Sequence, residues 1–220
     1  MRIDAVALVP AGGSARRLGP RGSAGKAALV VDGLTFLDRV CAALAAEVPR
    51  VVVVAAPGTA LPPVRPPVEV IHDSRSGAGP LAAVCDGLVH ALAASPPPRR
   101  AVLCSCDVPL LVPGVVRLLL DRVETPGVRW ALPTVGGHPQ PLVSAIAVDL
   151  LAEIIDHLAG GRGGLRDLAA RIANERPDAV RRVGEDELRA VDPALDSFRD
   201  VDTAEDLAEV VRRGSRPWRG

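Results

Sequence analysis

Two kinds of hydrophobic pattern alternate along this chain. Short continuous runs of apolar and β-branched residues are typical of strands that are buried on both faces. They predict strands at Ile3–Val9, Val51–Ala56, Val68–Ile71, Ala101–Ser105, Val128–Leu132 and Leu142–Val148. Elsewhere the apolar residues recur at the spacing of one helix face. This spacing predicts helices at Leu34–Glu47, Pro80–Ala94, Pro113–Val123, Leu150–Leu158, Leu165–Ile172 and Thr203–Val211.

The alternation of strands and helices indicates an α/β fold. Strands joined by helices form right-handed βαβ units, which assemble into a largely parallel sheet. We expect one Rossmann-like domain over residues 1–213, with a mostly parallel twisted sheet and helices on both faces, and a flexible tail over 214–220. Such sheets bind ligands at the carboxyl ends of their strands, where the candidate site residues are expected.

Composition narrows the possible classes of function. The 26 basic and 26 acidic residues balance, which gives no reason to expect a polyanion or a membrane surface as a partner. Aromatic residues make up 2% of the chain, too few for base-stacking platforms on single-stranded nucleic acid. No apolar run reaches the roughly 20 residues that span a bilayer, and no signal peptide precedes the first strand. We expect a cytoplasmic protein that binds neither nucleic acid nor membranes.

Cys104 and Cys106 form a pair that could bind a metal. No second Cys or His pair stands at the spacing of a zinc ribbon. Cytoplasmic cysteines are normally reduced. We therefore expect free, buried thiols, with a metal or redox role as the alternative.

The first predicted strand runs into a glycine-rich loop that leads to Lys26, the only lysine of the chain. Because Arg supplies every other strongly basic side chain, a retained lysine suggests a need for a compact ammonium. Gly12 and Gly13 allow the backbone to approach a ligand closely, and their N–H groups can bind phosphate oxygens. Arg17 and Lys26 can neutralise a triphosphate. A solvated basic loop is the alternative, and we expect the Lys26 side chain to be exposed.

Two well-known glycine motifs do not match this loop. A Walker loop requires Ser or Thr after its lysine, whereas Ala27 follows Lys26. The dinucleotide fingerprint G-x-G-x-x-G does not follow the first strand either. The loop therefore indicates a different kind of phosphate binding.

Four aspartates lie where strands are predicted to end or a helix to begin. Asp107 follows the buried run Ala101–Ser105, where a carboxylate can bind Mg²⁺ together with phosphate oxygens. A helix N-cap is the weaker alternative, because the next predicted helix begins several residues later. Asp73 follows another predicted strand. Asp200 and Asp202 precede the last helix, where either could complete a metal site, cap the helix or lie in a solvated turn.

In their order along the chain, these features resemble the molybdenum cofactor guanylyltransferases. That family belongs to the nucleotidyltransferases with a Rossmann-like sheet of the nucleotide-diphospho-sugar transferase type. The resemblance extends over nearly the whole chain. The matching segments are Ala11–Lys26, Asp73 with Gly79–Ala82, Cys106–Pro109, His138–Leu142, Gly163–Leu168 and Val201–Leu207. Gly12 favours guanine, because related cytidylyltransferases carry Ala-Ala-Gly where this chain has Ala-Gly-Gly. The chain departs from the family at Asp200–Asp202, where guanylyltransferases carry Asn-x-Asn.

The resemblance implies a role for each candidate residue. The nucleotide-binding residues would be Pro10, Ala11, Gly12, Gly13, Ser14, Lys26, Asp73, Gly79, Pro80 and Asp107. The catalytic residues would be Lys26, Arg17 and Asp107, and the metal ligands Asp107 and Asp202. The acceptor would contact His138, Gln140 and Asp200. The implied cofactor is Mg²⁺. The implied partners are GTP, a molybdopterin-type acceptor and, transiently, molybdoenzyme maturation proteins.

The activity implied by the resemblance is transfer of GMP from GTP to the terminal phosphate of molybdopterin, with release of pyrophosphate. A phosphate dianion is itself a nucleophile, so catalysis would rest on alignment and charge neutralisation. Two alternatives stay open. One is a cytidylyltransferase or another small-phosphate nucleotidyltransferase on the same fold. The other is a non-catalytic nucleotide-binding accessory protein.

Overall fold

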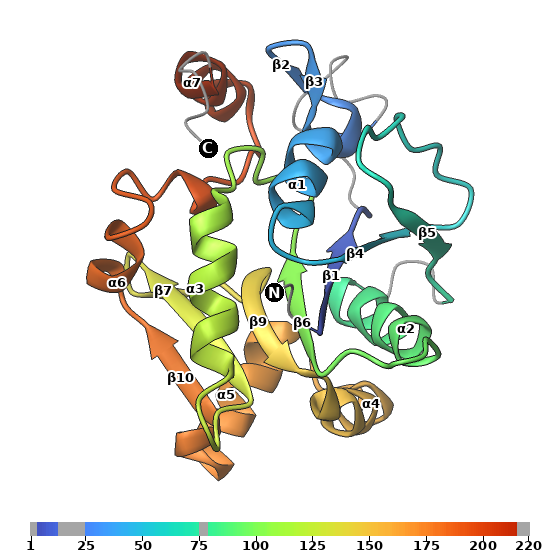
Figure 1. Ribbon diagram of the computed structural model, residues 1–220, viewed down its shortest axis with the longest axis vertical. Coiled ribbons are helices and arrows are strands. Elements are labelled where there is room, and N and C mark those ends of the chain that lie inside the picture. Colours follow the sequence, from blue (N-terminus) through green and yellow to red (C-terminus); the bar gives the residue numbers. More distant parts are fainter. Residues whose placement is uncertain (1–3, 13–24, 75–78, 215–220) are drawn as a thin grey trace.

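The computed structural model describes residues 4–12, 25–74 and 79–214. Its main sheet has the strand order β10–β7–β9–β6–β1–β4–β5, with β8 paired to β7 (Figure 1). The strands are β1 (Ala5–Pro10), β4 (Arg50–Ala55), β5 (Glu69–His72), β6 (Arg100–Cys104), β7 (Trp130–Val135), β8 (His138–Pro139), β9 (Val143–Ala147) and β10 (Val180–Val183). Along the main order only β9 is antiparallel to its neighbours. The predicted mostly parallel sheet is confirmed.

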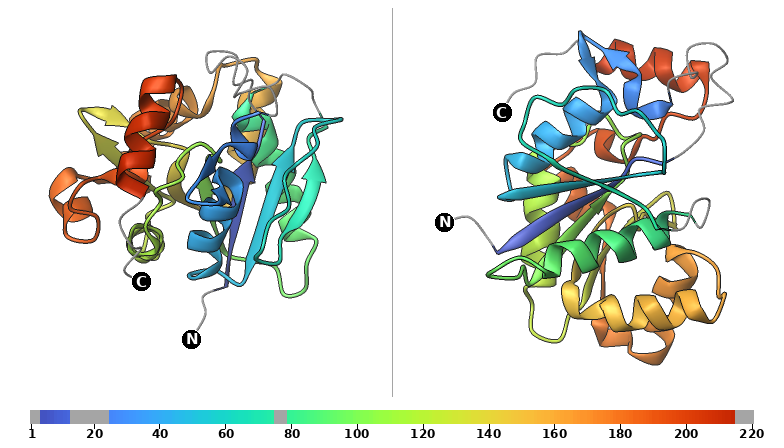
Figure 2. Two further views of the ribbon diagram at one scale, coloured as in Figure 1. Left: turned by 90° about the horizontal axis from the view of Figure 1, so that it is seen from above. Right: turned by 90° about the vertical axis from the view of Figure 1, so that its right-hand side faces the viewer.

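Helices cover both faces of this sheet, as predicted. The helices of the described ranges are α1 (Phe36–Ala45), α2 (Pro80–Leu92), α3 (Pro113–Val123), α4 (Leu151–Ala159), α5 (Leu165–Glu175), α6 (Glu185–Arg189) and α7 (Ala204–Gly214). Figures 1 and 2 show α1 and α3 on one side of the sheet and α2, α4 and α5 on the other. In β1, Ala7 and Val9 face the first core, whereas Val6 and Leu8 face the second. Because side chains alternate along a strand, one continuous apolar run supplies both cores.

A third, smaller core connects the C-terminal helix to the segment after the glycine loop. Leu29 and Phe36 pack in it together with Val201 and residues of α7. Lys26 lies three positions before Leu29, and Asp202 directly follows Val201. Burial of these apolar side chains therefore brings two distant parts of the chain together at one edge of the sheet.

The start of α7 agrees with the predicted capping box. The Thr203 N–H donates to Asp206 Oδ2 at 2.8 Å, and the Asp206 N–H donates to Thr203 Oγ1 at 3.2 Å. These bonds satisfy backbone groups that a helix start leaves unpaired. The helix extends to Gly214, past the predicted end at Val211. Residues 215–220 of the predicted tail lie outside the described part of the chain.

The predicted helix Leu34–Glu47 was wrong at its beginning. Leu34–Thr35 is strand β3, which pairs with β2 (Val30–Val31) across a turn at Asp32 and Gly33. Both turn residues have a positive φ, 51° and 76°. An Asp-Gly pair between apolar residues is a strong hairpin signal, so the sequence carried this information. Thr35 then caps α1 by accepting a 3.1 Å hydrogen bond from the Asp38 N–H.

No helix in the described ranges is both long and apolar enough to cross a membrane.

An ion-pair cluster attaches the edge strand β5 to β4 and α2. Arg50 donates hydrogen bonds of 2.8 and 2.9 Å to the Glu69 carboxylate, and His90 Nε2 lies 2.8 Å from the same group. Hydrogen bonding from Arg50, supported by His90, lowers the pKa of Glu69 to about 2. The charged form of Glu69 is therefore stabilised by the folded state.

We expect the Glu69→Gln variant to lose part of the pH dependence of stability. The pKa of Glu69 is lower in the folded chain than its ordinary value of 4.5, so its contribution is present above that value and is lost as the pH falls toward about 2. Glu69 is partly exposed, so we expect a difference of only about 1 kcal/mol at neutral pH. Thermal unfolding across this pH range measures it, with the exposed Glu205→Gln as control. Equal acid destabilisation of wild type and Glu69→Gln would contradict the assignment.

Candidate active site

The site lies at the carboxyl edge of the central strands. β1 and β6 are parallel neighbours, so the segments that follow them emerge side by side. The Ala11 N–H donates a 2.8 Å hydrogen bond to the Val54 carbonyl and holds the start of the glycine loop against β4. Asp107 follows β6 and does not cap α3, whose N-cap is Val112. The weaker N-cap alternative for Asp107 is therefore excluded.

Lys26 lies between two carboxylates. Its ammonium donates a 2.8 Å hydrogen bond to Asp107 Oδ2 and another hydrogen bond to Asp202 Oδ1. The Lys26 side chain is 14% exposed, so the expectation of an exposed loop lysine was wrong. Burial lowers the pKa of Lys26, but hydrogen bonds and charges from Asp107 and Asp202 outweigh it, and the net pKa is raised. Lys26 therefore carries a fixed positive charge at neutral pH.

A backbone hydrogen bond holds residues 200–202 beside Asp107. The Val201 N–H donates to the Asp107 carbonyl at 3.2 Å, and the Val201 side chain is fully buried. Desolvation, together with the negative charges of Asp107 and Asp202, raises the pKa of Asp200. Within the described residues, three carboxylates thus lie near one ammonium, and their negative charge favours the binding of a further cation.

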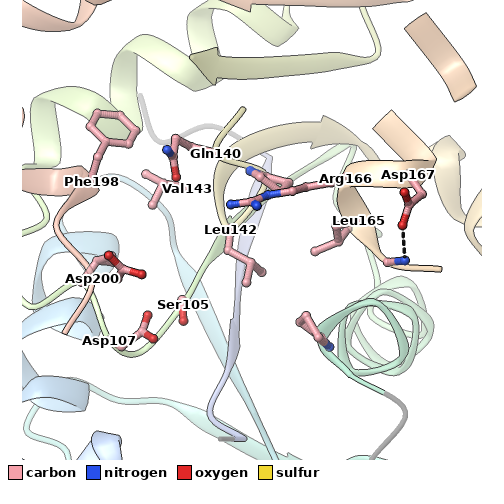
Figure 3. Close-up of a pocket in the computed structure, with 14 residues that line it drawn as sticks. Ser105, Asp107, Gln140, Leu142, Val143, Leu165, Arg166, Asp167, Phe198 and Asp200 are labelled. Carbon is pink, nitrogen blue, oxygen red and sulfur yellow. Dashed lines mark hydrogen bonds between the residues drawn. The ribbon is translucent and has the colours of Figure 1, made fainter. Parts of the chain in front are cut away.

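A cavity of about 400 Å³ opens beside two of these carboxylates, Asp107 and Asp200, whereas Asp202 does not line it (Figure 3). Asp107 and Asp200 lie close together on one side, and Arg166 extends into the cavity from the start of α5 on another. The rest of the lining combines apolar side chains with a few polar groups. It comprises Pro80, Ser105, Val108, Gln140, Pro141, Leu142, Val143, Gly164, Leu165, Asp167 and Phe198. A lining of this kind is typical of small-molecule sites.

The glycine loop is described only at its beginning. Pro10 ends β1, and Ala11 and Gly12 follow it at the carboxyl edge. A Cβ at Gly12 would lie 4.0 Å from the Ala56 Cβ, an ordinary contact distance. The described residues around position 12 therefore do not by themselves require glycine there. The predicted residues Gly13, Ser14 and Arg17 lie outside the described residues.

The predicted nucleoside segment lies at the same edge of the sheet. Asp73 follows β5, and its N–H donates a 2.9 Å hydrogen bond to the Ala55 carbonyl at the end of β4. Gly79 is the N-cap of α2 with a φ of 80°, a conformation that favours glycine. Pro80 is the first residue of α2 and lines the cavity.

Two of the three predicted acceptor residues line the cavity, and the third does not. Gln140 and Asp200 line the cavity, and the Gln140 N–H donates to the Pro133 carbonyl at 2.9 Å. His138 is exposed on β8 and is not among the lining residues, because β8 pairs with β7 and forms the hairpin there.

Ser105, Arg166 and Phe198 line the cavity although the sequence did not identify them as site residues. Ser105 immediately follows β6, and this position at a strand end could have identified it as a site residue. Arg166 lies in the first turn of a helix after a glycine-rich segment. Nothing in the sequence around Phe198 indicated a place in the site, although Phe198 is one of only two phenylalanines in the chain.

The donor set fits a divalent cation that also binds phosphate. Within residues 4–12, 25–74 and 79–214, no group of three or more His, Cys, Asp or Glu side chains could hold a metal ion by itself. Asp107 and Asp202 nevertheless converge on one point, the Lys26 ammonium. Mg²⁺ commonly uses one or two carboxylates and completes its shell with water and substrate phosphates.

The cysteines are free thiols, as predicted. Burial, with a smaller effect from the charge of Asp107, raises the pKa of Cys106 to about 12. Burial likewise raises the pKa of Cys104 well above its ordinary value. Both side chains are buried in the first core, where such thiols contribute to packing.

The fold and the site define the class of protein. A mostly parallel sheet with a Lys–Asp cluster and a cavity at its carboxyl edge defines an α/β protein that binds a small molecule at this edge. Residues 7–178 match the family model of the MobA-like NTP transferase domain. The chain belongs to this family.

Individual relatives and solved structures are also similar to this chain. A curated relative from Mycobacterium avium, described as a probable molybdenum cofactor guanylyltransferase, is 35% identical over 170 residues, which cover 73% of this chain and 78% of the relative. The crystal structure of molybdopterin-guanine dinucleotide biosynthesis protein A from Archaeoglobus fulgidus has a TM-score of 0.74 at 21% identity, covering 96% of this chain and 99% of the other. The 2-C-methyl-D-erythritol 4-phosphate cytidylyltransferase from Thermus thermophilus has a TM-score of 0.70 at 20% identity, covering 98% and 100%. At these identities the two structures support the fold alone.

Proposed function

We propose that this protein transfers GMP from GTP to the terminal phosphate of molybdopterin and releases pyrophosphate. The observation that carries the proposal is the Lys26 ammonium, held between Asp107 and Asp202, with Asp107 also lining a cavity of small-molecule size. Membership of the MobA-like family and the likeness to a probable molybdenum cofactor guanylyltransferase support the choice of substrates.

In the proposed reaction, an oxygen of the acceptor phosphate attacks the α-phosphorus of GTP, and the bond from that phosphorus to pyrophosphate breaks. Lys26 stabilises the negative charge on the departing pyrophosphate, together with Arg17. The cavity walls hold the acceptor, so that its phosphate is aligned with the nucleotide. No covalent intermediate with a side chain is needed, because the ionised acceptor phosphate is already a nucleophile.

Asp107 and Asp202 would hold Mg²⁺, with Asp200 nearby. When bound, the metal supplies a Lewis acid that neutralises charge on phosphate oxygens. Lys26 pairs with the same two carboxylates in this structure. These two bonds use two of the three N–H donors that a lysine ammonium carries, so a contact with a phosphate oxygen does not require either bond to break.

A nucleotide panel tests the proposed function. GTP, CTP and ATP are each supplied with Mg²⁺ and molybdopterin-loaded carrier protein, and pyrophosphate release is followed. We expect release with GTP. A preference for CTP would support the cytidylyltransferase alternative, and GTP binding without turnover would support a nucleotide-binding accessory protein. Transient contact with molybdoenzyme maturation proteins stays a prediction.

Gly12→Ala should reduce GTP use more than CTP use. The added Cβ has room among the described residues, so we expect the fold to tolerate it, whereas a large purine edge brought against the loop would be displaced. The measurement is the ratio of kcat/KM for GTP and CTP in wild type and variant, with thermal unfolding as a control for stability. An unchanged ratio would show that Gly12 does not determine the choice of base. The preference for guanine would then lose the support that it draws from Gly12.

A further inference from the structure

Arg166 is placed differently from most arginines of this chain. It lies in the first turn of α5, is exposed to solvent, and extends into the cavity between Gln140 and Leu142 (Figure 3). Most other arginines in the described ranges form ion pairs with Asp or Glu. Among the residues that the structure describes, the Arg166 guanidinium has no ion pair or hydrogen bond.

The nearest candidate partner along the chain is already engaged. Asp167 Oδ2 accepts a 2.9 Å hydrogen bond from the Gly164 N–H and thereby caps its own helix. Gly163 adopts a φ of 81°, and a Cβ there would collide with this carboxylate. The glycine-rich segment thus holds Asp167 against the helix start and leaves Arg166 directed into the cavity.

The cavity therefore has charges of opposite sign at two places. Asp107 and Asp200 mark the side on which the nucleotide phosphates and metal would bind. Arg166 lies away from them, with the apolar Leu142 and Leu165 also in the lining. An acceptor whose phosphate reacts beside Lys26 would extend its remaining part along this lining toward Arg166.

We propose that Arg166 positions the acceptor by donating hydrogen bonds to a group at the end remote from the reacting phosphate, a group that accepts hydrogen bonds or is anionic. The proposal rests on the proposed function and deepens it. A guanidinium offers a planar fork of donors, which suits a pterin edge or a pair of thiolates. Arg166 would thus select acceptors that carry such a group in addition to a phosphate.

The test compares Arg166→Gln with Arg166→Lys and the matched control Arg162→Gln. Arg162 is exposed in the same glycine-rich segment, but its guanidinium pairs with Asp156 at 3.0 Å and does not line the cavity. Binding of metal-free molybdopterin and of 6-hydroxymethylpterin is measured anaerobically on each full-length protein by fluorescence quenching. GTP affinity and the KM values for both substrates are measured in parallel.

We expect Arg166→Gln to weaken molybdopterin binding about 10- to 100-fold, the scale of a lost hydrogen bond to a charged group. The KM for GTP and the thermal midpoint should stay unchanged, Arg166→Lys should recover part of the affinity, and Arg162→Gln should resemble wild type. A parallel loss for 6-hydroxymethylpterin would assign the contact to the pterin edge. A loss confined to molybdopterin would assign it to the dithiolene.

Failure of the proposed role of Arg166 and failure of the proposed reaction give different results. If wild type binds molybdopterin and Arg166→Gln binds it equally well, the role of Arg166 is overturned while GMP transfer stands. If wild type binds molybdopterin through Arg166 but releases no pyrophosphate with any nucleotide, the proposed reaction is overturned and the positioning role stands. If wild type does not bind molybdopterin at all, both proposals are wrong.

Discussion

Lys26→Ala is expected to lower kcat/KM for GTP on the order of 10²-fold or more. The variant removes the ammonium that would stabilise charge on the departing pyrophosphate, and one such electrostatic donor has an effect on this scale. Lys26→Arg should recover little activity, because the space between Asp107 and Asp202 holds a compact ammonium and a guanidinium fork is larger and planar. Pyrophosphate release with GTP and molybdopterin is the measurement.

The control for this prediction is Arg117→Ala, which removes a surface cation paired with Glu47 at 2.8 Å outside the site. Circular dichroism and thermal unfolding then separate loss of chemistry from loss of structure. Because Lys26 is mostly buried and bonded to two carboxylates, we expect Lys26→Ala to be somewhat less stable at neutral pH, although still folded. Near-normal turnover in this variant would rule out Lys26 as a phosphate-contacting residue.

Asp107→Asn is expected to abolish Mg²⁺-dependent activity. The amide has nearly the same size as the carboxylate but lacks the negative charge that a hard divalent cation requires. The backbone hydrogen bond from the Val201 N–H to the residue 107 carbonyl does not involve the side chain, so residues 200–202 should keep their place. GTP affinity without metal should change little, or rise as a negative charge near the phosphates is removed.

The measurement for Asp107→Asn is a titration of pyrophosphate release against Mg²⁺, together with GTP binding in the presence and absence of the metal. Asp121→Asn on the exposed side of α3 removes one carboxylate outside the site and should behave like wild type. Full activation of Asp107→Asn by Mg²⁺ would mean that the metal binds elsewhere, and Asp202 would then be the better candidate ligand.

Local patterns predicted most of the fold and part of the site. The continuous apolar runs identified the strands that are buried on both faces, such as β1 and β6, since few other structures accommodate them. Asp107 was found because a carboxylate at the end of a buried parallel strand lies at the binding edge. In contrast, β10 and α6 were missed, because two arginines interrupt the apolar residues of β10 and Leu188 is the only apolar residue of α6.

The sequence by itself determined which residue types were available and that Lys26 and Asp107 would lie at the carboxyl edge of one sheet. Their partnership was decided by the tertiary structure, because Lys26 is 81 positions from Asp107 and 176 from Asp202. The small core around Leu29 and Val201 closes that separation, and the ammonium then becomes buried between two carboxylates rather than exposed. The position of Arg166 was decided in the same way. No local pattern specifies which charges will meet, since that depends on how buried apolar side chains place distant segments against one another.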